Sequence, residues 1–325
     1  MIKSHRFLRQ FIRFITLLIA TCAIAFLLME ASPIDPVQSY IGAGVAVSSE
    51  QREQISAYWG LDQSPIERFY TWGNHLLHGD FGDSLIYRRP VLQVIGEKFT
   101  NSFCLMLAAW LGAGLIGLFL GCLMGLYENR WPDKILKTIS YLFASTPAFW
   151  LGLLLLLFFA VYLELFPIGF SAPIGVAAAD ITWGQRLYHL FLPALTLSLT
   201  SFANIALHTR EKLIAIYHSD FILFAKARGE SNKSIFFRHG LRNILLPAIS
   251  LQFASFSELF GGSVLAETVF SYPGLGQAAV NAGLRGDIPL LLGITLFSVI
   301  FVFCGNLMAD ILYGWADPRT KEASK

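Results

Sequence analysis

The sequence is poor in charge for its length. Only 14% of its 325 residues are Asp, Glu, Lys or Arg, whereas a soluble globular domain carries about 25%. Hydrophobic residues make up 55% of the chain. These proportions exclude a typical soluble globular domain and indicate a protein whose solvent is lipid.

Cysteine is scarce as well. The chain has four, and no pair has the Cys-x-x-Cys spacing of a metal or redox site. Each cysteine falls inside an apolar stretch, where it is expected to act as a small core residue. We therefore predict no metal site from Cys22, Cys104, Cys122 and Cys304.

Nucleotide-binding and catalytic motifs are missing. No Gly-Lys pair occurs, which excludes the phosphate-binding loop Gly-x4-Gly-Lys-Ser/Thr, so the chain is not itself an ATPase. Asp80-Phe81-Gly82 matches the magnesium motif of protein kinases, but no His-Arg-Asp catalytic loop accompanies it and the match is chance. With no nucleophile motif and no histidine–carboxylate cluster, we expect no catalytic residue and disfavour a membrane enzyme.

What the chain does have is long apolar stretches. Each is long enough to cross a hydrocarbon core about 30 Å thick, so we predict six transmembrane helices. They lie near residues 11–30, 101–127, 138–166, 189–208, 246–269 and 288–313. The first could instead be a cleaved signal peptide, but the run from Phe14 to Met29 is longer than the usual signal core.

Basic residues indicate the orientation. With an even number of spans both termini share a side, and Lys and Arg concentrate on the cytoplasmic side. The N-terminus, the 128–137 loop, the 210–242 region and the C-terminal tail together hold most of the Lys and Arg residues. We therefore expect residues 1–10, the C-terminus and the segment around 220–247 to be cytoplasmic.

The outer side carries one substantial segment, residues 31–100, which we expect to form a small extracytoplasmic cap. Two amphipathic helices are predicted within it, at about 49–58 and 65–78. His75 and His78 lie three residues apart and could share one face of the second helix. Two histidines without a third ligand are weak evidence of a metal site, so we favour an amphipathic surface helix.

Residues 220–247 form a long, basic, helix-prone insertion between two apolar stretches. Asp220 can cap a short helix that ends at Gly229, because glycine tolerates the left-handed conformation just past a helix end. Ser231 can cap a second helix, and Pro247 limits how that helix continues. The pattern predicts a compact helix–turn–helix anchored at both ends by membrane spans.

The face of each short helix follows from residue spacing. We expect Phe221, Phe224 and Ala225 to lie together on the first helix, with Lys226 and Arg228 free to face water or a partner. Three interpretations remain open at this stage. The segment is a loop whose basic residues contact anionic lipid, a docking element that lies in a groove of a soluble partner, or, least favoured because spans flank it closely, a nucleic-acid-binding motif.

Several residues are candidates for a pathway or gate. Ionisable residues within spans are costly and usually face the bundle interior or water, which singles out Glu258 in the fifth span. A structural hydrogen bond to a neighbouring helix is the equal alternative. Gly261 and Gly262 are expected to permit close helix approach. Tyr272-Pro273-Gly274-Leu275-Gly276 breaks the helix on the outer side, as part of a gate, a binding-protein contact or a simple turn.

Three segments resemble the permease subunits of binding-protein-dependent ABC importers, in the dipeptide, oligopeptide and nickel family. They are "AKARGESNKSIFFRHGLRNILLP", "LDQSPIERFYTWGNHLLHGDFGDSLIYRRPV" and "ETVFSYPGLGQAAVNA", and an Asp317-Pro318-Arg319 tail extends the similarity. The first resembles the loop of these permeases that docks on the ATPase. We assign the docking contact to Asp220, Phe224, Ala225, Ala227, Arg228, Gly229, His239, Arg242, Asn243 and Pro247. The loop departs from the family at its leading acidic residue, where Phe224-Ala225-Lys226-Ala227 stands instead.

The resemblance implies an all-α, type I importer permease fold. Residues 11–30 would be the first span, and residues 101–325 the permease domain with an ATPase-docking loop at 211–247. The implied partners are a second, homologous permease forming a heterodimer, two cytoplasmic ATPases that hold ATP and Mg²⁺, a solute-binding protein and membrane lipid, with no nucleic acid and no cofactor on this chain.

The implied location is the bacterial inner membrane. The expected cargo is a nickel or other metal chelate, or a di- or oligopeptide, and a weak likeness of "SELFGGSVLAETVFSYPG" favours the metal chelate. An ion-gradient-driven secondary transporter is the alternative. It would predict inverted repeats and interacting charged residues near the membrane midplane.

Overall fold

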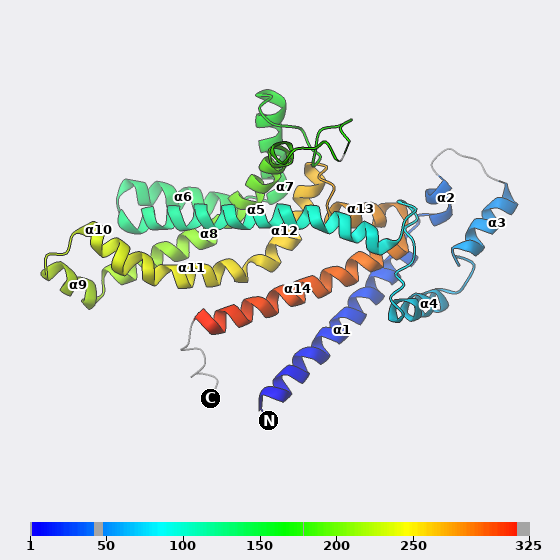
Figure 1. Ribbon diagram of the computed structural model, residues 1–325, viewed down its shortest axis with the longest axis horizontal. Helices are drawn as coiled ribbons and strands as arrows, with labels where there is room; N and C mark the ends of the chain where they lie inside the picture. The colour runs from blue at the N-terminus through cyan, green and yellow to red at the C-terminus, as the bar shows by residue number, and fades with distance from the viewer. Residues whose placement is uncertain (1, 42–47, 178, 317–325) are drawn as a thin grey trace. The chain divides into compact units, whose positions relative to one another are not determined.

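The computed structural model describes residues 2–41, 48–177 and 179–316. These residues form helices and loops (Figure 1), with a single isolated backbone bridge between Asp83 and Pro90. The Asp317-Pro318-Arg319 tail that carries part of the resemblance lies outside the described residues. The chain divides into two compact units, Met1–Asn101 with Pro273–Phe303 and Ser102–Tyr272 with Cys304–Lys325.

Among the residues that the structure describes, four helices are long and apolar enough to cross a membrane. They are Ile12–Glu30 within α1 (Ile2–Glu30), α5 (Val91–Leu126), α8 (Trp183–Tyr217) and Ile288–Met308 within α14 (Ile288–Ala316). Two bent helix pairs bring the count to six if each pair is one span. The number of spans expected from the sequence agrees with this upper count, although α5 begins at Val91 rather than near residue 101.

The third expected span, 138–166, is not a single straight helix. It is split into α6 (Trp131–Ser145), α7 (Ala148–Leu155) and the π-helix η1 (Leu156–Tyr162), and the two parts meet at 107°. Thr146 is extended, with φ −86° and ψ 127°. The proline ring of Pro147 disfavours a helical conformation of the residue before it, which explains the break.

The fifth expected span, 246–269, is also bent. It consists of α11 (Arg242–Ala254) and α12 (Phe256–Val269), and the helices on either side of Ser255 are inclined by 59°. The bend lies in the middle of the apolar stretch, where periodicity predicted a continuous helix.

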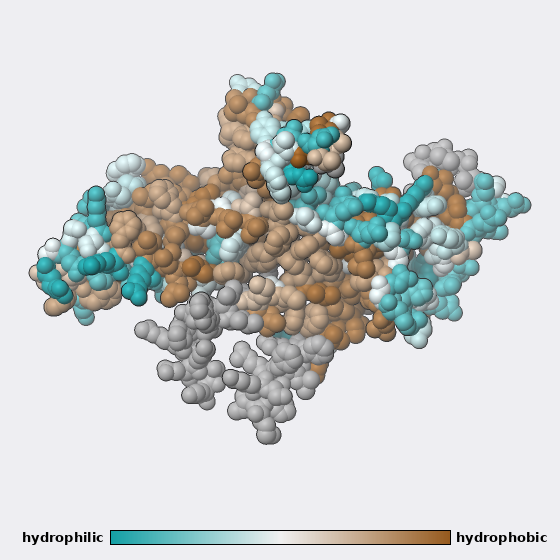
Figure 2. All heavy atoms as spheres, in the orientation of Figure 1, coloured by the Kyte–Doolittle hydropathy of each residue, from teal (hydrophilic) through white to brown (hydrophobic). Residues whose placement is uncertain are grey.

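The second unit is built around α8. Helices α6, α7, α11 and α12 all pack against it, and Figure 1 shows α6 and α8 running side by side. Its buried side chains include Leu197, Phe202 and Leu213. On the visible face of this unit, apolar side chains cover the helices and hydrophilic ones gather at the end formed by α9 and α10 (Figure 2). Outward apolar side chains such as Leu142 and Leu246 suit contact with lipid.

A row of glycines brings α5 close to α8 in this unit. Cβ atoms added at Gly117, Gly121 and Gly125 would lie 2.6 to 2.9 Å from atoms of α8, which is closer than real Cβ contacts. Glycines four residues apart are a common way for membrane helices to approach, since attraction between them comes from close packing rather than from exclusion of water. The second span is therefore held by shape complementarity.

The first unit contains residues 31–100, the segment that the sequence predicts to lie outside the cytoplasm. The two helices expected there are confirmed as α3 (Ser49–Tyr58) and α4 (Pro65–Leu77). Each begins with a capping box, at Ser48 and at Ser64, in which the serine side chain accepts from the third helical N–H and the residue at that position accepts from the serine backbone. The hydrogen bond from Ser64 lowers the pKa of Glu67 below its usual value. Two short helices were missed, α2 (Pro36–Ile41) and α13 (Leu275–Arg285).

A buried aspartate ties the loop at residues 80–90 to the corner between α13 and α14. Asp287 is fully buried and accepts hydrogen bonds from Ser84 Oγ at 2.6 Å, Ile86 N at 3.0 Å and Leu290 N at 3.1 Å. Burial raises the pKa of its carboxyl, against the opposing effect of these hydrogen bonds. The contact fixes where the 80–90 loop sits relative to the start of α14.

Candidate functional site

The basic insertion folds as the expected pair of short helices. These are α9 (Asp220–Ala227) and α10 (Asn232–Ile235), and α10 continues as the π-helix η2 (Phe236–Leu241) into α11. Gly229 has φ +78°, its N–H donates to Lys226 O, and the N–H of Glu230 donates to Ala225 O. This is a Schellman turn, which requires the left-handed conformation at the glycine.

The caps differ in one respect from expectation. Ser231 does cap α10, accepting from Ser234 N at 3.3 Å. Asp220, however, is the first residue of α9, and Ser219 occupies the N-cap position without a side-chain cap hydrogen bond. The carboxylate of Asp220 still lies in the first turn, where the helix dipole favours negative charge.

The predicted grouping of Phe221, Phe224 and Ala225 on one face of α9 is wrong. Ala225 is buried together with Ile222 and Ile235, and this cluster packs against Ile216 and Tyr217 at the end of α8. Ile222 and Ala225 are three residues apart, so they share the face that α8 covers.

The opposite surface of the insertion is apolar and exposed. Phe221, Leu223, Phe224 and Phe237 are 48%, 68%, 65% and 64% exposed. The basic side chains of Lys226 and Arg228 are exposed around them, as expected, and Arg228 lies over the Phe224 ring at 5.9 Å. We call Phe221, Leu223, Phe224 and Phe237 the docking face. A patch of aromatic side chains with a basic rim is typical of a surface that a partner covers.

Polar contacts connect the insertion with the rest of the second unit. His218 Nε2 lies 2.8 Å from a carboxylate oxygen of Glu128, in the loop after α5. The predicted site residue His239 lies 3.4 Å from Glu230, and its carbonyl accepts from Asn243 Nδ2 at 2.6 Å. The first contact ties the end of α8 to the loop after α5, and the contact between His239 and Glu230 holds η2 against the turn that follows α9.

The remaining residues assigned to the loop lie at the end of α9 and in the first two turns of α11. Ala227 is exposed at the end of α9, and Arg242 is exposed at the start of α11. Pro247 does not limit the helix as expected, because α11 continues through it. Proline is tolerated inside membrane helices when neighbouring groups satisfy the freed backbone carbonyl.

The pathway candidates lie in α12. Glu258 is in its first turn and exposed, and its carboxylate makes no hydrogen bond or ion pair with the residues that the structure describes. The alternative of a structural hydrogen bond is therefore not observed. Close approach at the two glycines is not found either, since a Cβ at Gly261 would meet nothing within 4 Å and one at Gly262 would make an ordinary contact with Leu197 at 3.5 Å.

The expected helix break after α12 is present. Tyr272 is buried in the second unit, with its N–H donating to Glu267 O at 2.8 Å. In the first unit, Pro273 O accepts from Asn101 Nδ2 at 3.0 Å, Gly274 is the N-cap of α13 and Gly276 is buried in its first turn. The segment is a structured turn into a helix that periodicity did not reveal.

Known proteins resemble this chain over most of its length. The sequence model of the family described as binding-protein-dependent transport system inner membrane component matches residues 117–322. The chain is 31% identical over 315 residues to the oligopeptide transport system permease protein AppB of Bacillus subtilis, covering 96% of this chain and 98% of that protein. It is 32% identical over 315 residues to the glutathione transport system permease protein GsiC of Escherichia coli K12, covering 97% and 98%.

A solved structure agrees at the level of fold. A chain of the MetNI methionine ABC transporter in an inward-facing conformation matches with a TM-score of 0.56 at 16% identity, covering 70% of this chain and 97% of that one. The chain therefore belongs to the family of binding-protein-dependent transport system inner membrane components, as a permease subunit of a bacterial ABC importer with the type I fold.

Proposed function

We propose that this chain forms half of a translocation pathway and receives the energy of ATP hydrolysis through its docking face. The observation that carries the proposal is the two-sided packing of α9. Ile222 and Ala225 are buried against the end of α8, while Phe221 and Phe224 are left exposed. A helix held on one side by a membrane span and bare on the other is suited to lie in a groove of a soluble protein.

The docking face is connected to two membrane helices by short or continuous segments. α9 follows α8 after a short turn, and η2 runs without interruption into α11. A displacement of the docking face is thus passed to two spans through packed side chains rather than through a flexible loop. Partner ATPases would hold ATP and Mg²⁺, and by binding one state of the permease more tightly they would shift it between inward-facing and outward-facing forms.

The proposed assembly has a second permease as the other half, two cytoplasmic ATPases and an extracytoplasmic solute-binding protein. The type I fold and the family support this assembly. We place both termini and the docking face in the cytoplasm on the distribution of Lys and Arg. The apolar outer surface of α1, which includes Leu17, Leu27 and Leu28, would then face the lipid of the inner membrane.

For the cargo we propose a short peptide or a glutathione-like peptide. The support is that two relatives aligned over nearly the whole chain are named as oligopeptide and glutathione permeases. The metal-chelate cargo favoured by the sequence has no such support, since neither of these relatives is named for metal transport. Uptake of a labelled tripeptide by proteoliposomes that contain the whole complex tests this proposal, and uptake of a nickel chelate alone would contradict it.

Replacing Gly229 with valine is expected to uncouple transport. A β-branched residue at φ +78° costs about 1–3 kcal/mol, so the Schellman turn rearranges and α9 leaves its position. Uptake should fall at least about tenfold while ATP hydrolysis by the complex continues and the chain still inserts in the membrane. Parallel assays of uptake and phosphate release by the reconstituted complex measure both quantities.

Two variants serve as controls for this result. Gly229→Asn should retain transport, because asparagine tolerates the left-handed conformation. Gly175→Val places the same strain elsewhere, since Gly175 has φ +84° and, like Gly229, no atom within 4 Å of an added Cβ. Normal uptake by a well-expressed Gly229→Val variant would contradict the assignment of the docking loop.

A further inference from the structure

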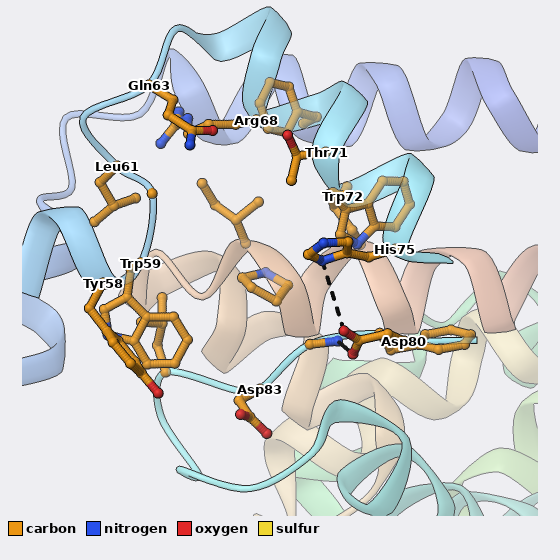
Figure 3. Close-up of a pocket in the computed structure, with 18 of the residues that line it drawn as sticks. Tyr58, Trp59, Leu61, Gln63, Arg68, Thr71, Trp72, His75, Asp80 and Asp83 are labelled. Carbon is orange, nitrogen blue, oxygen red and sulfur yellow. Dashed lines mark hydrogen bonds and ion pairs between the residues drawn. The ribbon is translucent and has the colours of Figure 1, made fainter. Parts of the chain in front are cut away.

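A pocket of about 430 Å³ lies in the first unit, within the extracytoplasmic segment. Its walls come from the loop after α3, from α4, from the loop at 80–85 and from the start of α14, as Figure 3 shows. Pockets that bind small molecules have volumes of about 300–1,000 Å³. The pocket is therefore large enough for a ligand of a few residues, and nothing in the transport mechanism uses it.

Aromatic rings form much of the lining. In Figure 3, Tyr58 and Trp59 lie on one side and Trp72 on another, and Phe81 also lines the pocket. Tyr58 and Trp59 pack edge to face, with ring centroids 5.3 Å apart. Such rings attract an apolar body through contact area and a cation through the negative potential of their faces.

Three hydrogen-bond donors in the same walls have no acceptor. The indole N–H groups of Trp59 and Trp72 and the Nε–H of Arg68 are shielded from solvent and donate to none of the residues that the structure describes. A buried polar group without a hydrogen-bond partner is energetically unfavourable. A ligand that brought carbonyl or carboxylate oxygens to these walls would recover that energy after small side-chain rotations.

The charge of the pocket is negative. The guanidinium of Arg68 is paired with the carboxylate of Glu30, which leaves the carboxylates of Asp80 and Asp83 in the lining without a strong cationic partner. One oxygen of Asp80 accepts from Gly82 N at 2.9 Å, and the other is 3.8 Å from His75 Nδ1. Asp83 makes no ion pair among the described residues and is exposed. In Figure 3 both acids stand at one end of the pocket, across from Arg68.

We propose that this pocket binds a primary ammonium group that is attached to an apolar body and has acceptor oxygens close by. The ammonium would lie between Asp80, Asp83 and the aromatic rings, and the oxygens would accept from Trp59, Trp72 and Arg68. The amino end of a short peptide has this chemistry, and so does the headgroup of an aminophospholipid. The identification of the ligand as a peptide rests on the proposed function. The inference that the pocket binds an ammonium group rests on the lining residues alone.

The pocket would then hold cargo outside the membrane pathway. Its lining includes Phe26 of α1 together with Ile288 and Leu292 of α14, so an occupant would contact two spans at their outer ends. The site is separate from the solute-binding protein and belongs to the permease itself.

Calorimetric titration of the full-length chain in phosphatidylcholine nanodiscs tests the proposal. The probe is alanyl-phenylalanyl-alanine, compared with its N-acetylated form, which lacks the ammonium. We expect the free peptide to bind at least about tenfold more tightly than the acetylated one, which corresponds to about 1.4 kcal/mol. Absence of binding at millimolar peptide, or equal binding of the two forms, would overturn the proposal.

Variants locate the binding. Asp80→Asn combined with Asp83→Asn should weaken binding about tenfold, and Trp72→Phe, which keeps a ring but removes the N–H, about fivefold. The matched controls are Glu50→Gln combined with Glu53→Gln, which removes two exposed carboxylates of α3, and Trp183→Phe, which alters a tryptophan that is 79% exposed in the other unit. The controls should leave affinity unchanged. Peptide binding that is insensitive to all pocket variants would place the ligand elsewhere and overturn the proposal.

Two further measurements separate the sources of the ligand and the two proposals. In nanodiscs that contain phosphatidylethanolamine, loss of peptide affinity would assign the same ammonium site to the lipid headgroup, and unchanged affinity would assign it to the peptide. Peptide uptake by the whole complex without binding in the pocket would overturn this inference and leave the proposed function standing. Binding of the peptide in the pocket without peptide uptake by the complex would contradict the proposed cargo and leave this inference standing.

Discussion

Replacing Asp133 with asparagine is expected to lower the free energy of unfolding by about 3 kcal/mol, the lower end of the cost of breaking a buried ion pair, because the change leaves the partly buried guanidinium of Arg210 without its counter-charge. Asp133 is 1% exposed and lies in the first turn of α6. Its two oxygens accept from Arg210 Nε at 2.6 Å and Arg210 Nη2 at 2.7 Å, and one also accepts from Asn129 N at 2.8 Å. The pair joins α6 to α8 close to the end of α8 that leads into α9.

Thermal unfolding of the purified chain in detergent measures this effect. Arg210→Met should be similarly damaging, since it leaves the carboxylate buried and unpaired, whereas Asp133→Leu combined with Arg210→Met should recover much of the loss. Glu97→Gln is the control. Glu97 also forms a bidentate pair, with Arg89 at 2.9 Å for both bonds, but the two side chains are 58% and 43% exposed, so we expect a change below about 1 kcal/mol. Equal melting of the Asp133→Asn and wild-type chains would contradict the role assigned to the buried pair.

Local features of the fold were predictable from the sequence. The helices of the outer segment follow Ser48 and Ser64, and the serine and the residue three positions on form a capping box in each case. Gly229 marked the end of α9 because few other residues adopt its backbone conformation. Helix caps and glycine turns depend on a few neighbouring residues. They can therefore be predicted without knowing which other elements pack against the helix.

Features that depend on distant residues were not predictable. Phe221, Ile222 and Phe224 are all apolar, and only the position of α8 decides that Ile222 is buried and the two phenylalanines are exposed. The bend after Ser145 had a local signal in Pro147, but a long apolar run concealed it. The partners Asp133 and Arg210 are 77 residues apart, and neither sequence position indicates the other.

The pocket in the first unit also depends on residues that are distant in the sequence. Trp59, Trp72 and Asp83 lie on different elements with no shared periodicity. The individual residues are ordinary for an outer segment. Only the fold brings unpartnered N–H groups and two carboxylates to one cavity, so the candidate site could not be anticipated.

Replacing Gly121 with valine is expected to destabilise the second unit by about 3 kcal/mol, at the upper end of the usual cost of overpacking. A Cβ at this position would lie 2.6 Å from both the backbone oxygen of Ala206 and the Cβ of Thr209. A backbone oxygen cannot rotate away as the end of a long side chain can, so α5 and α8 must separate. Their separation would also forfeit the close packing at Gly117 and Gly125, since all three glycines lie on one face of the helix.

Gly96 provides the control within the same helix. An added Cβ there would meet nothing within 4 Å, so Gly96→Ala should leave stability unchanged or raise it by up to about 1 kcal/mol through better helix propensity. Thermal unfolding of Gly121→Ala, Gly121→Val and Gly96→Ala in one detergent compares them directly. We expect a graded loss at position 121, because even alanine adds the atom that clashes and valine adds two more. An unfolding temperature of Gly121→Val equal to that of the wild-type chain would mean that α5 and α8 pack less closely than the structure shows. The glycine row would then have no role in holding the second span.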